Sequence, residues 1–249
     1  MKDFFCGRKV GRGGMMLLLS LAVAMGGGCV KRVEKSDKAL EHEKWIASLD
    51  DSVAALGREA ELARTRLDES TVLTSQLLEK FEYVNNPREV EGYTILRGWR
   101  ARYPLSSTGL VARIMENEGL ELVAALSGGV FSRIRVSAGG ESVESESVPY
   151  DQALNYRAQG LNTVAFTGGK ADSVAAFVSE HLGEKIELAF LESGVSGRMI
   201  LPEANCNMIA ETWKLYSTRQ EVGRLEKQLP LINARISALR RLKDSRSGK

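Results

Sequence analysis

Residues 39–84 read ALEHEKWIASLDDSVAALGREAELARTRLDESTVLTSQLLEKFEYV. Apolar residues recur in this stretch at alternating three- and four-residue steps, and they are Ala39, Ile46, Leu49, Val53, Leu56, Ala60, Ala63, Leu67, Leu77, Phe81 and Val84. Only His42, Ser70 and Thr74 interrupt the series. A repeat held for about six heptads predicts one long helix with a coiled-coil stripe. At about 1.5 Å per residue this helix is roughly 65 Å long, and a stripe of that length needs a partner helix.

Residues 203–243 supply that partner. They carry a second stripe of the same kind, formed by Met208, Leu215, Val222, Leu225, Leu229, Ile232, Ile236 and Leu239. If the two helices are antiparallel and meet at the segment inserted between them, Leu225 falls near Thr65. Pro230 predicts a kink or a break, because proline removes a helical hydrogen bond and clashes one turn back. We expect the small residues Gly57, Ala60 and Ala63 to lie opposite it and to allow a close approach.

The first 28 residues are typical of a targeting segment. A basic start with Lys2, Arg8, Lys9 and Arg12 precedes an apolar core at 15–25 and three glycines at 26–28, directly before Cys29. The succession resembles the bacterial lipoprotein signal, although Gly26 stands where that family usually has Leu. The resemblance implies acylation of Cys29 as the mature N-terminus and a location in the bacterial cell envelope. A cleaved secretory signal with an incidental cysteine is the alternative. Residues 29–38 are polar and are interpreted as a tether.

The cysteines agree with this interpretation. Cys6 lies in the targeting segment and Cys29 would carry the lipid, which leaves Cys206 alone in the mature protein. No internal disulfide is then expected. Cys206 is predicted to pack near a helix start rather than to act as a nucleophile, because no activating pattern accompanies it.

Composition limits the function further. The chain has 249 residues, is 43% hydrophobic and 27% charged, and has a net charge of +2. These values exclude a disordered or membrane-embedded chain and give no reason to expect nucleic-acid binding. Only two histidines occur, and no metal-ligand, phosphate-loop or nucleophile motif is complete. We therefore expect no metal, no cofactor and no enzymatic activity.

Residues 91–202 alternate β-type segments with turn signals. The expected strands lie at 109–115, 120–126, 131–138, 141–148, 161–167, 186–190 and 199–201, with one helix at 174–182. The predicted fold class is α+β, a long antiparallel helical hairpin that carries an inserted β-rich head with one short helix. The expected organisation is a signal at 1–28, a tether at 29–38, a first helix at 39–84, the head at 91–202, a return helix at 203–243 and a basic tail at 244–249. We expect the head to fold independently, since about 110 residues can bury a core.

Three aromatic residues, Tyr93, Trp99 and Tyr103, alternate with arginines near the start of the head. Aromatic rings beside arginine can form a surface for a ligand or a partner protein. The alternative, which we favour, is that they seat the head on the end of the helices.

The sequence as a whole predicts a non-catalytic, membrane-tethered extracytoplasmic lipoprotein with a structural or protein-interaction role, whose partner is another protein or a second copy. The alternative is a peptidoglycan- or glycan-binding module of the cell envelope. The arginines and lysines from Arg235 to Lys249 suit a solvated helix end. They would also suit anionic lipid headgroups.

Overall fold

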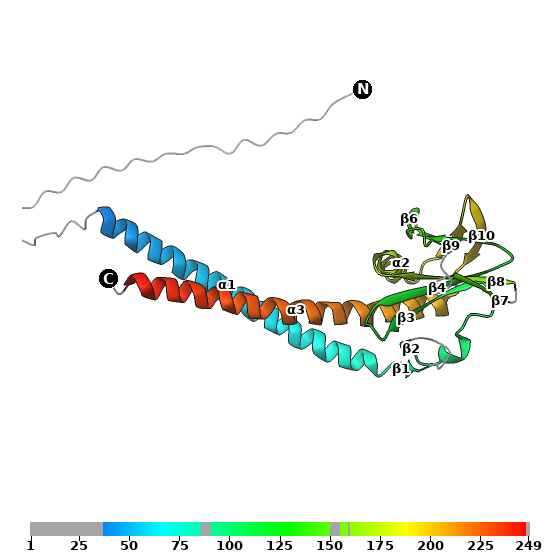
Figure 1. Cartoon of the computed structure of the whole chain (residues 1–249), viewed down its shortest axis with the longest axis horizontal. Coiled ribbons are helices and arrows are strands. Elements are labelled where there is room, and N and C mark those ends of the chain that lie inside the picture. Colours follow the sequence, from blue (N-terminus) through cyan, green and yellow to red (C-terminus); the bar gives the residue numbers. More distant parts are fainter. Residues whose placement is uncertain (1–36, 86–90, 150–154, 159, 248–249) are drawn as a thin grey trace, which may run out of the picture. The chain divides into compact units, whose positions relative to one another are not determined.

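The computed structural model describes residues 37–85, 91–149, 155–158 and 160–247. It divides into two compact units, Met1–Lys44 and Trp45–Lys249, and all contacts given below lie within the second unit. The described residues form three α-helices and two antiparallel sheets, so the coarse α+β prediction is confirmed (Figure 1). The predicted signal at 1–28, Cys29 and the tether as far as residue 36 lie outside the described residues.

The first long helix, α1, spans Asp37–Leu78, and the strand β1 follows at Phe81–Val84. The prediction that the helix continues to Val84 was therefore wrong. Phe81 and Val84 continue the three- and four-residue spacing, but both are buried in the core of the head. Their backbone pairs with the strand β2, Tyr93–Leu96, in the register Phe81↔Leu96 and Val84↔Tyr93. Pairing with β2 satisfies the backbone groups that a longer helix would have satisfied internally.

The second long helix, α3, spans Glu203–Ser247 and includes Pro230 without a break. Most of the predicted basic tail therefore belongs to this helix. The close approach expected at Gly57 is also absent, since a Cβ atom added there would have no neighbour within 4 Å. The missing N–H of Pro230 leaves the Glu226 carbonyl without its helical donor, and both residues are exposed, so water can reach that carbonyl.

Contacts between α1 and α3 run in antiparallel order. Lys243 Nζ lies 2.5 Å from Asp50 Oδ1, Gln228 Nε2 lies 3.2 Å from Glu59 Oε1, and Lys80, just beyond α1, pairs with Glu211 at 2.9 Å. A small apolar cluster joins Ala60 to Ile232 and Ile236, with Val53, Leu56 and Leu229 packed against it. The predicted stripes therefore meet around this cluster.

The larger sheet has six strands in the order β1-β2-β3-β4-β8-β7. Its remaining strands are β3 (Gly109–Met115), β4 (Leu120–Ser127), β7 (Asn155–Ala158) and β8 (Leu161–Thr167). The predicted β3–β4 hairpin is confirmed, and its turn is closed by the Gly119 N–H, which donates to Asn117 Oδ1 at 2.9 Å. A short 3₁₀ helix, η1, spans Arg100–Arg102 between β2 and β3.

The smaller sheet has four strands in the order β10-β9-β5-β6. They are β5 (Arg133–Ala138), β6 (Glu141–Glu144), β9 (Glu187–Leu191) and β10 (Val195–Ile200). Gly139 and Gly140 connect β5 to β6 with φ angles of 58° and 89°, a left-handed conformation that glycine adopts without strain and that confirms the predicted two-residue turn. The helix α2, Gly169–Glu180, contacts strands of both sheets and also α3.

One edge of β3 depends on α3. Strand β2 pairs only with Ile114 and Met115, which leaves the rest of that β3 edge without a strand partner among the described pairings. Side chains of α3 take the strand's place there. Asn205 Nδ2 donates to the Leu110 carbonyl at 2.9 Å, and the Ala112 N–H donates to Met208 Sδ at 3.3 Å. The first turns of α3 therefore complete the sheet as well as cover it.

The core of the head extends beyond the predicted 91–202 range. A single cluster of buried residues combines side chains of both sheets and α2 with Leu77, Phe81, Met208, Ile209 and Leu215. The expectation of a head that folds on residues 91–202 alone therefore needs correction. Such a fragment lacks both the edge strand β1 and the helix that covers β3.

We predict that a fragment of residues 91–202 lacks fixed tertiary structure, because it loses the helix that buries one face of β3. A fragment of residues 70–220, which keeps β1 and the first half of α3, should fold. Near-ultraviolet circular dichroism and thermal unfolding of the two fragments check this expectation. A cooperative transition in the shorter fragment would contradict it.

Candidate functional site

The aromatic residues singled out in the sequence lie inside the head. Tyr93 and Trp99 are buried, and Tyr103 is partly buried against the same core. The Tyr93 and Tyr103 rings meet edge to face with their centroids 5.3 Å apart. The Arg113 guanidinium lies over both rings, 4.6 Å from the centroid of Tyr93 and 4.7 Å from that of Tyr103. The interpretation of these aromatics as an exposed ligand platform is therefore wrong, because their faces are occupied by the protein itself.

Arg113 belongs to a buried ion pair that sequence reasoning missed. It faces Glu121 across the β3–β4 hairpin, with Nη2 lying 2.6 Å from Glu121 Oε1. Both side chains are buried and have lost contact with water. The attraction between the two opposite charges compensates part of that desolvation cost. The signal in the sequence was an arginine and a glutamate in two otherwise apolar strands. Only the strand register shows that the two residues lie directly opposite each other.

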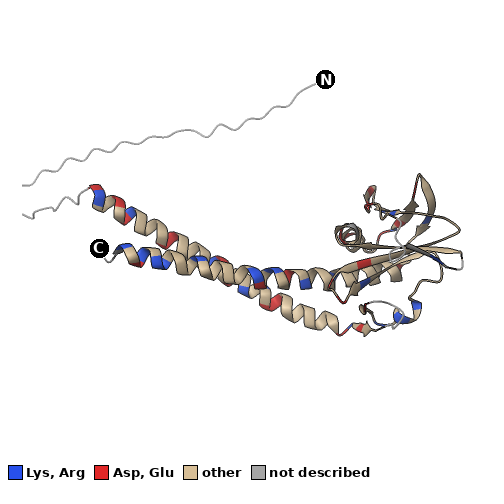
Figure 2. Ribbon diagram, viewed as in Figure 1, with Lys and Arg blue, Asp and Glu red and all other residues tan. Residues whose placement is uncertain are grey.

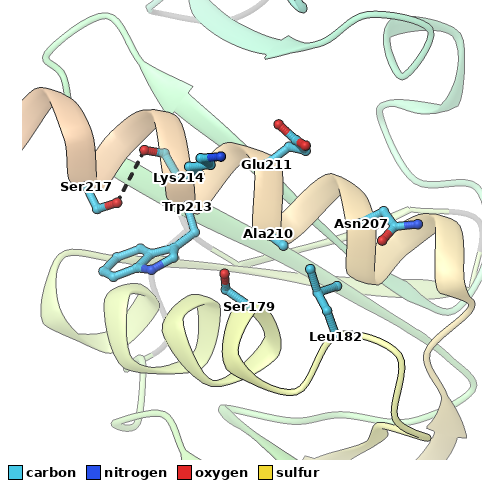
Figure 3. A pocket seen from close by; sticks show the side chains of 8 residues that line it. All are labelled: Ser179, Leu182, Asn207, Ala210, Glu211, Trp213, Lys214 and Ser217. Atoms are coloured by element: carbon cyan, nitrogen blue, oxygen red, sulfur yellow. Dashed lines mark hydrogen bonds between the residues drawn. The ribbon is translucent and has the colours of Figure 1, made fainter. Parts of the chain in front are cut away.

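A groove lies between α2 and the first half of α3 (Figure 3). It has a volume of about 380 Å³ and is lined by Ser179 and Leu182 from α2 and its end, and by Asn207, Ala210, Glu211, Trp213, Lys214 and Ser217 from α3. In Figure 3 the Trp213 indole projects from α3 toward α2, and Ser179 and Leu182 point back toward α3. Leu182 is exposed and Trp213 is partly exposed, so the groove offers apolar surface among polar groups.

A second hollow of about 360 Å³ adjoins the first and shares Leu182 and Asn207 with it. It continues past Gly183, where the chain leaves α2, to Ile200 and Cys206. Helix α2 ends at Glu180, and the residues that follow it, Leu182 to Lys185, line the second hollow together with the start of α3. Together they form an elongated surface that fits an extended segment better than a compact ligand.

Several polar groups of the groove already have partners. Glu211 is paired with Lys80, and the Ser217 hydroxyl donates to the Lys214 carbonyl at 3.3 Å, the dashed line in Figure 3. The nearby His181 has Nδ1 2.9 Å from the Phe177 carbonyl oxygen, and its ring stacks on Phe177. No cluster of metal-binding side chains occurs among the described residues. The arrangement suits recognition through Trp213, Leu182 and Asn207.

Cys206 lies in the first turn of α3 and is buried, as the sequence predicted. Its Sγ lies 3.9 Å from the Leu201 carbonyl oxygen. Burial raises the pKa of the Cys206 thiol, and the Glu203 carboxylate raises it further. A thiol with a raised pKa forms less of the reactive thiolate, so the environment suits a packing role.

Asp172 is the polar group of the α2–α3 contact that is least satisfied. The Tyr216 hydroxyl donates to Asp172 Oδ2 at 3.4 Å, whereas the buried Oδ1 has no hydrogen-bond partner. Desolvation raises the pKa of the Asp172 carboxyl, and the bond from Tyr216 opposes the rise. Burial and the Asp172 charge also raise the pKa of Tyr216. The ionised form of Asp172 is therefore disfavoured in the folded protein.

We predict that Asp172→Asn stabilises the protein at neutral pH relative to wild type. A carboxyl whose pKa is higher in the folded state penalises folding once it ionises, and the penalty is absent where both states are protonated. The difference in melting temperature between variant and wild type should therefore grow from about pH 3 to pH 7. Tyr216→Phe, which removes the hydrogen bond to Asp172 Oδ2, should change stability in the opposite direction. A difference that does not vary with pH would contradict the assignment.

Comparison with known proteins found no similarity to interpret. The chain matches no protein-family model, and no similar curated protein or solved structure was found. No described helix is long and apolar enough to cross a membrane. Any function must therefore be argued from the residues and their geometry.

Proposed function

We propose that the chain is a non-catalytic lipoprotein of the bacterial cell envelope that presents its head to a protein partner. The observation that carries this proposal is the succession of a basic start, an eleven-residue apolar core and three glycines directly before Cys29. An apolar core of that length is too short to serve as a stable membrane span, so the acylated cysteine provides the anchor.

The two long helices act as the stalk, which we define as residues 45–78 of α1 and 219–247 of α3. The finer proposal is that they form an antiparallel coiled coil. Its support is the pairing of Asp50 with Lys243, the bond between Gln228 and Glu59, and the cluster of Ala60 with Ile232 and Ile236.

The head is the recognition element, and the α2–α3 groove is its contact surface. Trp213 and Leu182 supply apolar area, while Asn207 and Lys214 supply a hydrogen-bonding amide and a positive charge. Aromatic anchors surrounded by polar groups are typical of protein-binding surfaces. The partner that fits best is an extended protein segment with an apolar side chain for the groove and a carboxylate for Lys214.

We predict that Cys29→Ser abolishes acyl labelling and moves the protein from the membrane fraction to the soluble fraction, because the thioether-linked lipid is the proposed anchor. Metabolic labelling with a fatty acid and cell fractionation measure the two effects. Cys206→Ser is the matched control, since the buried Cys206 should accept no lipid. Unchanged labelling and membrane retention of Cys29→Ser would exclude the lipoprotein proposal.

Glycan binding is the second candidate, and the observation that favours it is the partly exposed Trp213 in a groove that Ser179, Ser217 and Asn207 also line. An indole face with amide and hydroxyl groups around it can stack on a sugar ring and hydrogen-bond to it. Sedimentation of the full chain with isolated peptidoglycan tests this candidate. Binding should fall at least about tenfold in Trp213→Ala, a loss of about 1.4 kcal/mol, and should persist in Trp45→Ala. Equal binding by both variants would exclude the groove as the glycan site.

A further inference from the structure

The outer side of α3 in the stalk is basic and partly apolar. We call it the basic face, and its residues follow one another at three- and four-residue steps and are all exposed: Lys227, Leu231, Arg235, Ala238, Arg241 and Leu242. Leu231 and Leu242 are 66% and 41% exposed. The side of α3 that packs on α1 buries Ile232 and Ile236 instead. The basic face therefore points away from α1.

No carboxylate interrupts the basic face. The stretch 227–243 contains five lysines and arginines and neither aspartate nor glutamate. The nearest carboxylates in sequence, Glu226 and Asp244, lie about 120° around the helix from Ala238. The exposed leucines are therefore surrounded by positive charge alone on this side of the helix.

The outer side of α1 has no such excess of positive charge. The exposed Arg58 and Arg66 occur there together with the exposed Asp51 and Glu69. Figure 2 shows basic positions gathered along the C-terminal part of α3, whereas positions of both signs occur along α1. Of the two stalk helices, α3 therefore offers the continuous positive surface to which an anionic partner is attracted.

The C-terminal end of the basic face lies beside the start of the stalk. Lys243 Nζ lies 2.5 Å from Asp50 Oδ1, and the Arg246 guanidinium lies 5.1 Å from the centroid of the Trp45 ring. In the sequence, Cys29 precedes the first residue of α1 by eight residues, which span at most about 29 Å when fully extended. An acylated Cys29 would therefore keep the start of α1 close to a lipid surface.

We propose that the basic face binds anionic headgroups of the membrane that anchors the chain, so that the stalk lies along the membrane surface. The face extends for about 22 Å along α3. Lys227, Arg235 and Arg241 meet the lipid phosphates, and the two exposed leucines enter the boundary of the acyl chains. A basic helix face with apolar side chains is typical of helices that bind membrane surfaces. This inference rests on the envelope location proposed above.

An anionic membrane fits the basic face better than an acidic protein does. Both would complement the cations, but the proposed acyl chain already holds the stalk next to lipid. Binding of the face then becomes an intramolecular step at high effective concentration, which a separate protein would have to reach by diffusion. Lipid also offers an apolar boundary for Leu231 and Leu242 directly beneath its charged groups.

The test places one nitroxide spin label on the basic face through Ala238→Cys, in the full chain with Cys6→Ser, Cys29→Ser and Cys206→Ser. The accessibility of the label to a neutral, water-soluble nickel chelate is measured with vesicles of phosphatidylglycerol and, separately, of phosphatidylcholine. Phosphatidylglycerol should shield the label, and phosphatidylcholine, which has no net charge, should not. A label at Ala55→Cys, an exposed alanine of α1, is the matched control and should remain accessible with both lipids.

Charge reversal then identifies the residues that bind lipid. Arg235→Glu and Arg241→Glu together should raise the concentration of phosphatidylglycerol that shields half of the Ala238→Cys label by at least about tenfold. Arg58→Glu with Arg100→Glu changes the net charge equally at exposed positions outside the basic face, so that concentration should stay unchanged. Circular dichroism of each variant establishes that it is folded.

A label at Ala238→Cys that stays accessible on phosphatidylglycerol, or that is shielded equally by phosphatidylcholine, would overturn the proposal. An accessible label together with binding of polyglutamate through Arg235 and Arg241 would also overturn it, because the occupant would then be an acidic protein. The protein in this test carries no acyl chain, so the result does not depend on acylation. Failure of acylation at Cys29 contradicts only the lipoprotein proposal, whereas an accessible label contradicts only the contact with lipid.

Discussion

The packing of the first turns of α3 on strand β3 is the contact on which the rest of the structure depends. Strand β2 leaves β3 after Ile114, and the backbone groups that it leaves behind would be unpaired inside the core. The Asn205 side-chain amide donates a hydrogen bond to the Leu110 carbonyl, and the Ala112 N–H donates to the Met208 sulfur. Buried backbone groups must be paired, so α3 cannot be removed from the head without exposing a sheet edge.

This constraint also creates the groove. Helix α3 packs on β3, and α2 packs on strands of both sheets. The sheets therefore determine how the two helices lie against each other. The contact between them is tight at Val174, Val178 and Leu215, which are fully buried, and opens where α2 ends. Leu182 follows the end of α2 and is exposed, and Trp213 is partly exposed between α3 and α2 (Figure 3). The candidate recognition surface thus forms where two helices that are distant in sequence pack side by side.

The same helix links the head to the stalk. In the C-terminal half of α3 the buried Ile232 and Ile236 pack against Ala60 of α1. A helix with different neighbours along its length needs different apolar faces in its two halves. On the opposite side of that half, Leu231 and Leu242 are exposed.

The sequence by itself determined the long helices, the β3–β4 and β5–β6 hairpins and the burial of Cys206, since these follow from periodicity and turn residues within short stretches. It could not determine that Phe81 and Val84 belong to a strand, because apolar residues three apart fit either element. The burial of Tyr93 and Trp99, and the pairing of Arg113 with Glu121, depended on which strands are neighbours. The groove could not be predicted either, because Trp213, Leu182 and Asn207 become a surface only when two helices distant in sequence pack on one sheet. Local patterns specify elements, whereas contacts between elements are decided by which buried groups must find partners across the fold.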